Sequence, residues 1–327
     1  MPRQARLDTP GALHHIMVRG INRSQIFDDN EDRSRFLTRL GENILKTHSS
    51  LYAWALMETQ VHLLVRSGPQ GISALMRKLL TWYAQYYNRR HRHTGHLFEN
   101  RYKSILCEEE NYLLALVRYI HLNPVRAKLV KTMGELDLYP WTGHRAIIGK
   151  DEYPWMDRAY ILGQFAGTKG KGIRAYHRFV QDGLAEGRRP ELTGGGLIRS
   201  QGGWSQVLAL RSRGEKELSD ERILGSGEFV EQILQEADER QLRQMKLRRK
   251  GKSIGDIIEG ECGRRKVSEQ ELRKGSRRAL VSEVRAAIAY RSKEELGISG
   301  AEIARQLGVS TSSINRVLGR MGPLPTE

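Results

Sequence analysis

The chain has 327 residues with 39% hydrophobic content, which is enough for about two domains with buried cores. Its formal net charge of +16 favours a polyanionic partner over an ordinary basic enzyme, because Lys and Arg gain affinity by releasing the counterions of phosphates. The only cysteines are Cys107 and Cys262, too few for a disulfide framework or a thiolate metal cluster. We find neither a signal peptide nor a membrane-spanning stretch, so secretion and membrane insertion are not expected.

Alternating strand and helix patterns fill the first 130 residues. Apolar runs predict strands, and apolar residues at spacings of three and four predict helices. In chain order the expected elements are a strand over 13–21, a helix beginning at Asn30, strands over 51–57 and 61–65, a helix over 72–88, a short strand over 104–107 and a helix over 109–128. This β-α-β-β-α-β order with an added helix predicts an α+β fold with a ferredoxin-like split antiparallel sheet, and it fits a doubly wound parallel sheet less well. We place this domain at residues 1–148.

A basic connector lies between the second helix and the last strand. Residues 89–103 contain five Arg or Lys and three His but only Glu99 as an acid. An exposed charged loop would have the same composition, but the net charge of the whole chain favours phosphate contacts. The basic side chains expected to make them are Arg89, Arg90, Arg92, Arg101 and Lys103.

A loop-rich segment follows from about residue 139 to 201. It contains three prolines and the run Gly194-Gly195-Gly196, which indicate either a connector that wraps a neighbour or a flexible hinge. No Lys-Ser/Thr follows the glycines, so a nucleotide-binding loop is poorly supported. We assign residues 149–260 to a loop-rich and helical connecting region.

The end of this region carries a basic helix. The helix begins near Phe229 and continues into residues 243–252, which include six Arg or Lys and no acid. A solvated helix end would have the same pattern, but the charge of the chain equally favours nucleic-acid contact. We single out Arg248 and Arg249 for that contact.

The C-terminal segment, residues 261–327, has the pattern of a helix-turn-helix. Short helices are expected over 301–307 and 311–320, separated by a turn at Gly308, and a preceding helix over 280–290 completes a three-helix module. In such units the start of the second helix enters the major groove of DNA. The residues at that position, which would also suit an ordinary exposed face, are Thr311, Ser312, Ser313, Asn315 and Arg316.

Four side chains in two motifs carry the candidate chemistry. Gln60 and His62 are two residues apart on a strand and therefore project from one face, whereas Tyr119 and Asn123 are four apart on a helix. All four could converge on one phosphate. A tyrosine attacks phosphorus only with assistance, because its unperturbed pKa is near 10, and a divalent metal held by strand and helix side chains provides that assistance.

The other histidines near these motifs have simpler explanations. His14 and His15 lie on the first predicted strand, where packing or surface roles are commoner than metal binding. His121 lies off the helix face that carries Tyr119. We assign chemistry to none of the three.

Two longer motifs resemble those of a known family. The connector reads GHLFENRYKS over residues 95–104, and the last helix reads YIHLNPVRA over residues 119–127. With the strand order, these motifs resemble the REP-associated tyrosine transposases, which belong to the single-tyrosine HUH transposases that cut and rejoin single-stranded DNA. The resemblance covers about residues 5–148. The phrases LTGGGLIRS at 192–200 and DERILG at 220–225 resemble a long subgroup that ends in a helix-turn-helix similar to the replication-initiator type.

This resemblance implies a mechanism and a substrate. Tyr119 is the implied nucleophile, which forms a 5′-phosphotyrosine intermediate, and His62 and Asn123 are implied ligands of Mg²⁺ or Mn²⁺. The implied fold is ferredoxin-like, and proteins of this family are often dimers. We interpret the chain as a bacterial transposase that is cytoplasmic and associated with the nucleoid. Its expected substrate is single-stranded hairpin DNA, such as a folded palindromic repeat, and the helix-turn-helix is expected to bind duplex DNA.

Gln60 departs from the family pattern, which has a histidine as the first metal ligand. An amide oxygen binds a hard cation more weakly than an imidazole does and with different electronics. Three outcomes stay open: a tolerated ligand swap, a slow nuclease that needs high metal, or a DNA-binding regulator that has lost cleavage. An RNA-binding module on a ferredoxin-like sheet is a further class, and the lack of an aromatic-rich strand motif argues against it.

Overall fold

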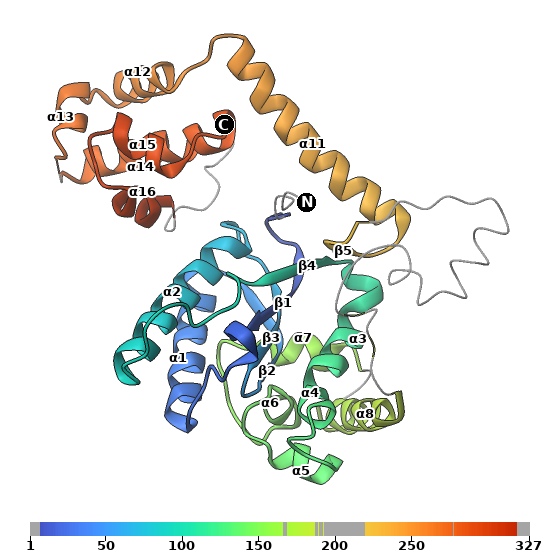
Figure 1. The fold of residues 1–327 in the computed structure, drawn as a ribbon. Coiled ribbons are helices and arrows are strands. Elements are labelled where there is room, and N and C mark those ends of the chain that lie inside the picture. The colour runs from blue at the N-terminus through green and yellow to red at the C-terminus, as the bar shows by residue number, and fades with distance from the viewer. Residues whose placement is uncertain are drawn as a thin grey trace. The chain divides into compact units, whose positions relative to one another are not determined.

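The computed structural model describes residues 7–165, 169–186, 189, 192, 220–276 and 278–318, apart from the side chains of Arg240, Gln241 and Arg248. The chain separates into two compact units, residues 1–231 and 232–327 (Figure 1). The division into three domains stays a prediction. None of the helices in these described ranges is long and apolar enough to cross a lipid bilayer.

A five-stranded sheet forms the centre of the first unit. Its strands are β1 (Leu13–Arg19), β2 (Ser50–Leu56), β3 (Gln60–Arg66), β4 (Lys103–Cys107) and β5 (Ile223–Leu224). They lie in the spatial order β2-β3-β1-β4-β5, with antiparallel pairs throughout except for the parallel pair of β4 and β5. The arrangement of β1 to β4 is that of a ferredoxin-like split sheet, so the α+β prediction is confirmed. The addition of β5 makes the sheet mixed.

Helices cover both sides of this sheet. α1 (Asn30–Lys46) and α2 (Ile72–Arg90) lie on one side, and α3 (Glu109–His121) packs on the other side against β2 and β3 (Figure 1). Asp29 caps α1 by accepting a hydrogen bond from the backbone N–H of Asp32. Apolar side chains at helical spacing then bury one face of α1 in the core.

The helix predicted over 109–128 is interrupted in the structure. α3 ends at His121, and α4 (Asn123–Arg126) begins after Leu122. Pro124 explains the break, because proline has no N–H to donate to the carbonyl group four residues earlier. Leu122 itself keeps helical backbone angles (φ −86°, ψ −3°), so the interruption is a local one.

One α-helix precedes the segment predicted to be loop-rich, and three more lie within its described residues. They are α5 (Met133–Leu138), α6 (His144–Ile148), α7 (Arg158–Gly163) and α8 (Lys169–Asp182). Ile147, Ile161 and Tyr176 are fully buried in the core of the first unit. The loop-rich prediction missed α6 and α7 because they have only five and six residues, too few for a hydrophobic period. Pro190 and the run Gly194-Gly195-Gly196 lie outside the described residues.

The second unit is built from helices, as predicted for the C-terminal region. After α11 (Gly227–Arg249), which spans the boundary between the units in the chain, the helices are α12 (Ile254–Arg265), α13 (Glu269–Arg273), α14 (Ala279–Leu296), α15 (Gly300–Gln306) and α16 (Thr311–Leu318). Val284, Ile303 and Ile314 pack together in its core. Gly308, between α15 and α16, has a φ of +63°, and a Cβ there would lie 2.2 Å from the Arg273 carbonyl oxygen, so this turn requires glycine.

Candidate active site on the sheet

One face of the sheet gathers polar residues from three strands. In β3, Gln60 and His62 point to the same face because they are two residues apart. The antiparallel register sets Arg19 opposite Gln60 and Met17 opposite His62, and it sets Lys103 of β4 opposite Met17. Since directly opposed residues share a face, two cations flank the predicted metal ligands.

Helix α3 brings the candidate nucleophile to this face. The ring centre of Tyr119 lies 6.2 Å from that of His62 and 5.9 Å from that of His15. Asn123, the first residue of α4, is buried, and its Nδ2 has no hydrogen-bond partner in the part of the chain that the structure describes. The structure therefore brings Tyr119 into ring contact with His62, while Gln60 stands half-buried two residues earlier in the same strand.

His15 and His62 form a hydrogen-bonded pair whose proton positions follow from their partners. His15 Nδ1 lies 3.0 Å from the carbonyl oxygen of Leu192, which can only accept, so this nitrogen carries the proton. A neutral His15 then has a lone pair on Nε2, and His62 Nδ1, 3.0 Å away, donates to it. His62 Nε2 is left with a lone pair, as a metal ligand requires.

Burial keeps both imidazoles of this pair neutral. It lowers the pKa of His15 to about 4, although the hydrogen bond to Leu192 acts in the opposite direction. It also lowers the pKa of His62 well below its ordinary value, and the neighbouring His15 and Arg19 add to that effect. At neutral pH the pair therefore offers a lone pair and contributes no positive charge.

A guanidinium group covers the candidate nucleophile. Arg126 Cζ lies 4.9 Å from the centre of the Tyr119 ring, and Arg126 Nη1 donates a hydrogen bond of 3.0 Å to the Tyr119 carbonyl oxygen. Arginine stays protonated at neutral pH, so its charge is attracted to the face of the ring. The cation therefore lies over the aromatic ring of the candidate nucleophile.

The predicted phosphate contacts of the connector are all exposed. They are Arg89, Arg90, Arg92, Arg101 and Lys103, the last of which begins β4. Arg90 already donates to both carboxylate oxygens of Asp29, at 2.8 and 2.6 Å, and forms an ion pair with the buried Asp32. At the end of α11, Arg249 is exposed, and the side chain of Arg248 lies outside the described part of the chain.

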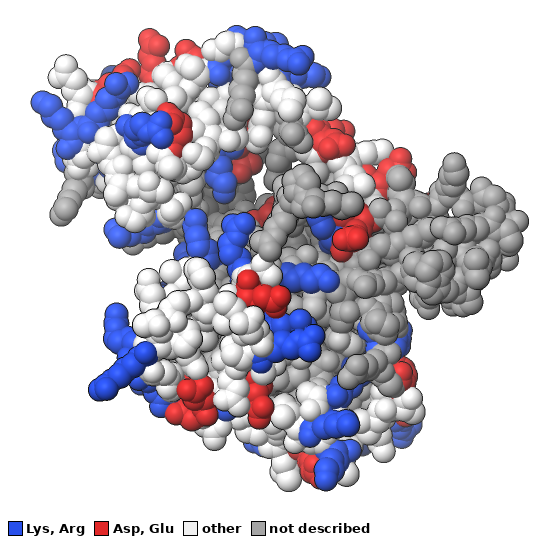
Figure 2. All heavy atoms as spheres, viewed as in Figure 1, with Lys and Arg blue, Asp and Glu red and all other residues white. Residues whose placement is uncertain are grey.

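Surplus positive charge is not confined to the connector. Lys and Arg side chains lie over much of the surface drawn in Figure 2, with Asp and Glu side chains scattered among them. In the second unit, the predicted groove-reading residues surround the start of α16. Ser310 caps that helix by accepting from the backbone N–H of Ser313 at 3.2 Å. Of the five, the exposed ones are Thr311, Ser312 and Arg316, and the half-buried ones are Ser313 and Asn315.

Sequence patterns did not identify His15 and Arg126 as members of this site. His15 is fully buried, which is compatible with a packing role, and it is also hydrogen-bonded to His62. Its neighbour His14 faces the other side of the sheet, where its Nδ1 lies 3.1 Å from Ser104 Oγ. Strand alternation could have shown that His15 and His14 point to opposite faces of the sheet. It could not have shown that His15 lies near His62, because that depends on the pairing of β1 with β3.

Comparison with known proteins finds a family model that matches part of the chain. Residues 10–123 match the family model of the IS200-like transposases, and this segment contains β1 to β4, Tyr119 and Asn123. No curated protein matches the chain. The solved structure of a REP-associated tyrosine transposase bound to a REP hairpin is 16% identical, with a TM-score of 0.39, over 52% of this chain and 93% of that one. The long form with a helix-turn-helix stays a prediction. Residues 10–123 of this chain are thus similar to the IS200-like transposases.

Proposed function

We propose that the protein is a metal-assisted tyrosine transposase that cleaves and rejoins single-stranded hairpin DNA. The observation that supports this most strongly is the position of the Tyr119 ring, which contacts neutral His62 and the guanidinium of Arg126. All but Arg126 lie within the segment that matches the IS200-like transposases. A buried core tyrosine would need neither neighbour.

In the proposed cleavage, the hydroxyl oxygen of Tyr119 forms a bond to phosphorus. The bond between phosphorus and the 3′ oxygen of the preceding nucleotide breaks, and that oxygen gains a proton while the tyrosine loses one. The 5′ phosphate stays on Tyr119, and attack by a 3′ hydroxyl reverses the step and rejoins the strand. Arg126 favours this reaction because its charge stabilises the tyrosinate as it develops.

The residues on the sheet fit a divalent cation, although with one strong ligand fewer than a histidine pair would give. His62 Nε2 has the required lone pair, and Gln60 and Asn123 offer amide oxygens, which hard cations such as Mg²⁺ or Mn²⁺ accept. The buried Nδ2 of Asn123 has no hydrogen-bond partner among the described residues; because it is a donor, the partner that fits it is an acceptor such as a phosphate oxygen, not the cation. When bound, the cation would polarise a phosphate oxygen.

His15 acts in this proposal through His62. By accepting the proton of His62 Nδ1, it fixes the tautomer that leaves Nε2 available, and its own proton is fixed in turn by the Leu192 carbonyl. Hydrogen bonds of this kind commonly orient metal-binding histidines. His15 is therefore a positioning residue.

We assign DNA binding to the basic surface and to the start of α16. The proposed phosphate contacts are Arg89, Arg90, Arg92, Arg101, Lys103, Arg248 and Arg249, and the proposed duplex-reading residues are Thr311, Ser312, Ser313, Asn315 and Arg316. For Arg90 this requires an additional contact beside its ion pairs with Asp29 and Asp32. A homodimer is part of the same proposal.

A second function is favoured by one residue, Gln60. With an amide in place of the first histidine, the protein would bind metal weakly and act as a DNA-binding regulator without cleavage. The two functions differ in whether DNA becomes covalently attached to the chain.

A covalent-adduct assay separates them. The full-length protein is incubated with labelled single-stranded hairpin DNA and Mn²⁺, and a denaturing gel reports the protein–DNA adduct. We expect an adduct with the wild type, none with Tyr119→Phe, and an undiminished one with Tyr112→Phe, a matched change on the same helix. An adduct that survives Tyr119→Phe would eliminate Tyr119 as the nucleophile. Absence of adduct in the wild type, with restoration by Gln60→His, would establish the regulator instead.

A further inference from the structure

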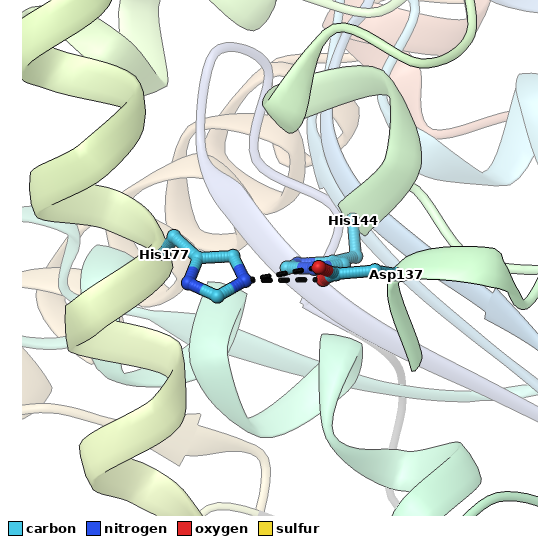
Figure 3. A group of neighbouring side chains, drawn as sticks. All are labelled: Asp137, His144 and His177. Carbon is cyan, nitrogen blue, oxygen red and sulfur yellow. Dashed lines mark hydrogen bonds and ion pairs between the residues drawn. The ribbon is translucent and has the colours of Figure 1, made fainter. Parts of the chain in front are cut away.

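A second histidine cluster lies in the first unit on the short helices that follow the family-matched segment. Asp137 of α5, His144 of α6 and His177 of α8 place one ligand atom each within 4.8 Å of the others (Figure 3). His144 Nε2 lies 2.8 Å from Asp137 Oδ1, and His177 Nε2 lies 3.1 Å from Asp137 Oδ2. The three side chains come from separate helices and converge on one point.

The exposure of these side chains decides what can reach them. His144 is fully buried, whereas the side chains of Asp137 and His177 are 21% and 33% exposed. Figure 3 shows His177 pointing from its helix toward the Asp137 carboxylate, with His144 beside the same group. The cluster is therefore anchored in the core on one side and open to water on the other.

Hydrogen bonding alone gives one consistent arrangement of protons. The carboxylate can only accept, so His144 Nε2 would donate to Asp137 and His144 Nδ1 would accept from the Tyr176 hydroxyl, 2.9 Å away. His121 Nδ1, 2.7 Å from the same hydroxyl, would then donate to it. In this state His121 Nε2 is left as a buried acceptor without a partner among the described residues.

A bound cation gives an equally complete arrangement with the opposite tautomer of His144. Its Nε2 would then hold the cation and its Nδ1 would donate to the Tyr176 hydroxyl, which would donate to His121. Metal-binding histidines commonly donate their second ring N–H to an oxygen in this way. Tyr176 is thus already in the position of the outer partner of a metal ligand.

We propose that Asp137, His144 and His177 form a binding site for a divalent transition metal, with zinc as the best fit. Two imidazole nitrogens and one carboxylate oxygen are a donor set that zinc prefers, and water would supply the fourth ligand. Ligand atoms around a tetrahedral zinc are roughly 3.3 Å apart, given bonds of about 2.0 to 2.1 Å. The observed separations of 2.8 and 3.1 Å need to widen by only a few tenths of an ångström.

Such a cation would join α5, α6 and α8. α5 and α6 have only six and five residues, so little local hydrogen bonding holds these two helices in place, whereas α8 has 14 residues. The site shares no residue with the sheet face that carries His62 and Tyr119. Its role would be to stabilise the first unit, separately from any DNA chemistry.

The test measures zinc retained by the full-length protein after chelator treatment, incubation with Zn²⁺ and desalting. It uses a His62→Ala background, in which the sheet site has lost its imidazole ligand. We expect about one zinc per chain in this background, the same in an added His93→Ala, and loss of that zinc in an added His177→Ala. His93 is a suitable control because it is an exposed histidine outside the cluster. Zinc should also raise the Tm of the His93 variant but not that of the His177 variant.

Two results would overturn the proposal. One is the absence of retained zinc in the His62→Ala background, and the other is equal retention after His177→Ala. Either would leave the cluster as a hydrogen-bond network only. If His177→Ala fails to fold, Asp137→Asn replaces it, because the amide keeps a hydrogen-bonding group but removes the charged ligand. Unchanged zinc retention in that variant would also count against the site.

Discussion

The two histidine clusters of the first unit stand on different scaffolds and suit different ions. His15 and His62 lie on neighbouring strands, and a neutral backbone carbonyl ends their chain of hydrogen bonds. His144 and His177 lie on separate helices, and the carboxylate of Asp137 bonds to both. A carboxylate with two imidazoles suits a zinc-like ion, whereas one imidazole with amide oxygens suits a weakly held hard cation. The partners of a histidine, more than the histidine itself, decide which metal it can bind.

Among the variants that test this difference between the clusters, His15→Phe is expected to have the largest effect. This variant keeps the ring volume but removes the acceptor that fixes the His62 tautomer, so the rate of adduct formation at limiting Mn²⁺ should fall by about 10- to 100-fold. His14→Phe is the matched control, because His14 is equally buried but faces the other side of the same strand. Equal rates in the two variants would show that His15 has only a packing role.

Acid stability tests the burial of His14, which lies next to His15 in β1 but faces the other side of the sheet. Burial lowers the pKa of His14 to about 4, with Asp8 acting in the opposite direction. The unfolded chain therefore binds a proton between pH 6.5 and 4 that the folded chain excludes, and stability falls as pH drops through this window. Between pH 7 and 5, wild type should lose about 2 kcal/mol more unfolding free energy than His14→Gln. Urea unfolding at both pH values measures this difference, with the exposed His48→Gln as control; parallel losses in all three proteins would contradict it.

A smaller effect is expected at the outer partner of the helical cluster. Tyr176→Phe removes the hydroxyl that bridges His144 and His121, so the zinc affinity of the cluster should fall by about tenfold. Competition with a zinc chelator of known affinity measures the change. Tyr153→Phe is the control, because Tyr153 packs on Trp54 and Trp155 away from the cluster. If Tyr176→Phe leaves the zinc affinity unchanged, Tyr176 does not orient His144 in the way that His15 is proposed to orient His62.

The sheet cluster was partly predictable from the sequence, and the reason is geometric. Strand alternation put Gln60 and His62 on one face, and helical spacing joined Tyr119 to Asn123 even though the helix is interrupted at Leu122. The strands themselves were placed to within about two residues, because each is a continuous apolar run. His15 was missed because its role depends on the order of strands in the sheet.

The helical cluster could not be predicted in the same way. Asp137, His144 and His177 are separated by 7 and 33 residues, so no local spacing connects them. His144 and His177 lie in a segment whose prolines and glycines predicted loops, and Asp137 lies just before it. Burial of Ile161 and Tyr176 in the common core, rather than any periodic pattern, brings the three side chains together.

The smallest effect concerns Arg126, the cation that stands over the nucleophile of the sheet cluster. Since a cation near an aromatic face contributes about 1 kcal/mol at a half-buried position, Arg126→Gln should slow adduct formation by about fivefold without abolishing it. Arg118→Gln is the matched control on the neighbouring helix, because Arg118 stacks on Phe179 at 4.4 Å and pairs with Glu186 instead. If Arg126 stabilises the tyrosinate, the loss should shrink as pH rises and the reaction needs less help to remove the tyrosine proton. A pH-independent loss would instead assign Arg126 to DNA binding or to the position of the ring, and the sheet cluster would then depend on its metal alone to activate Tyr119.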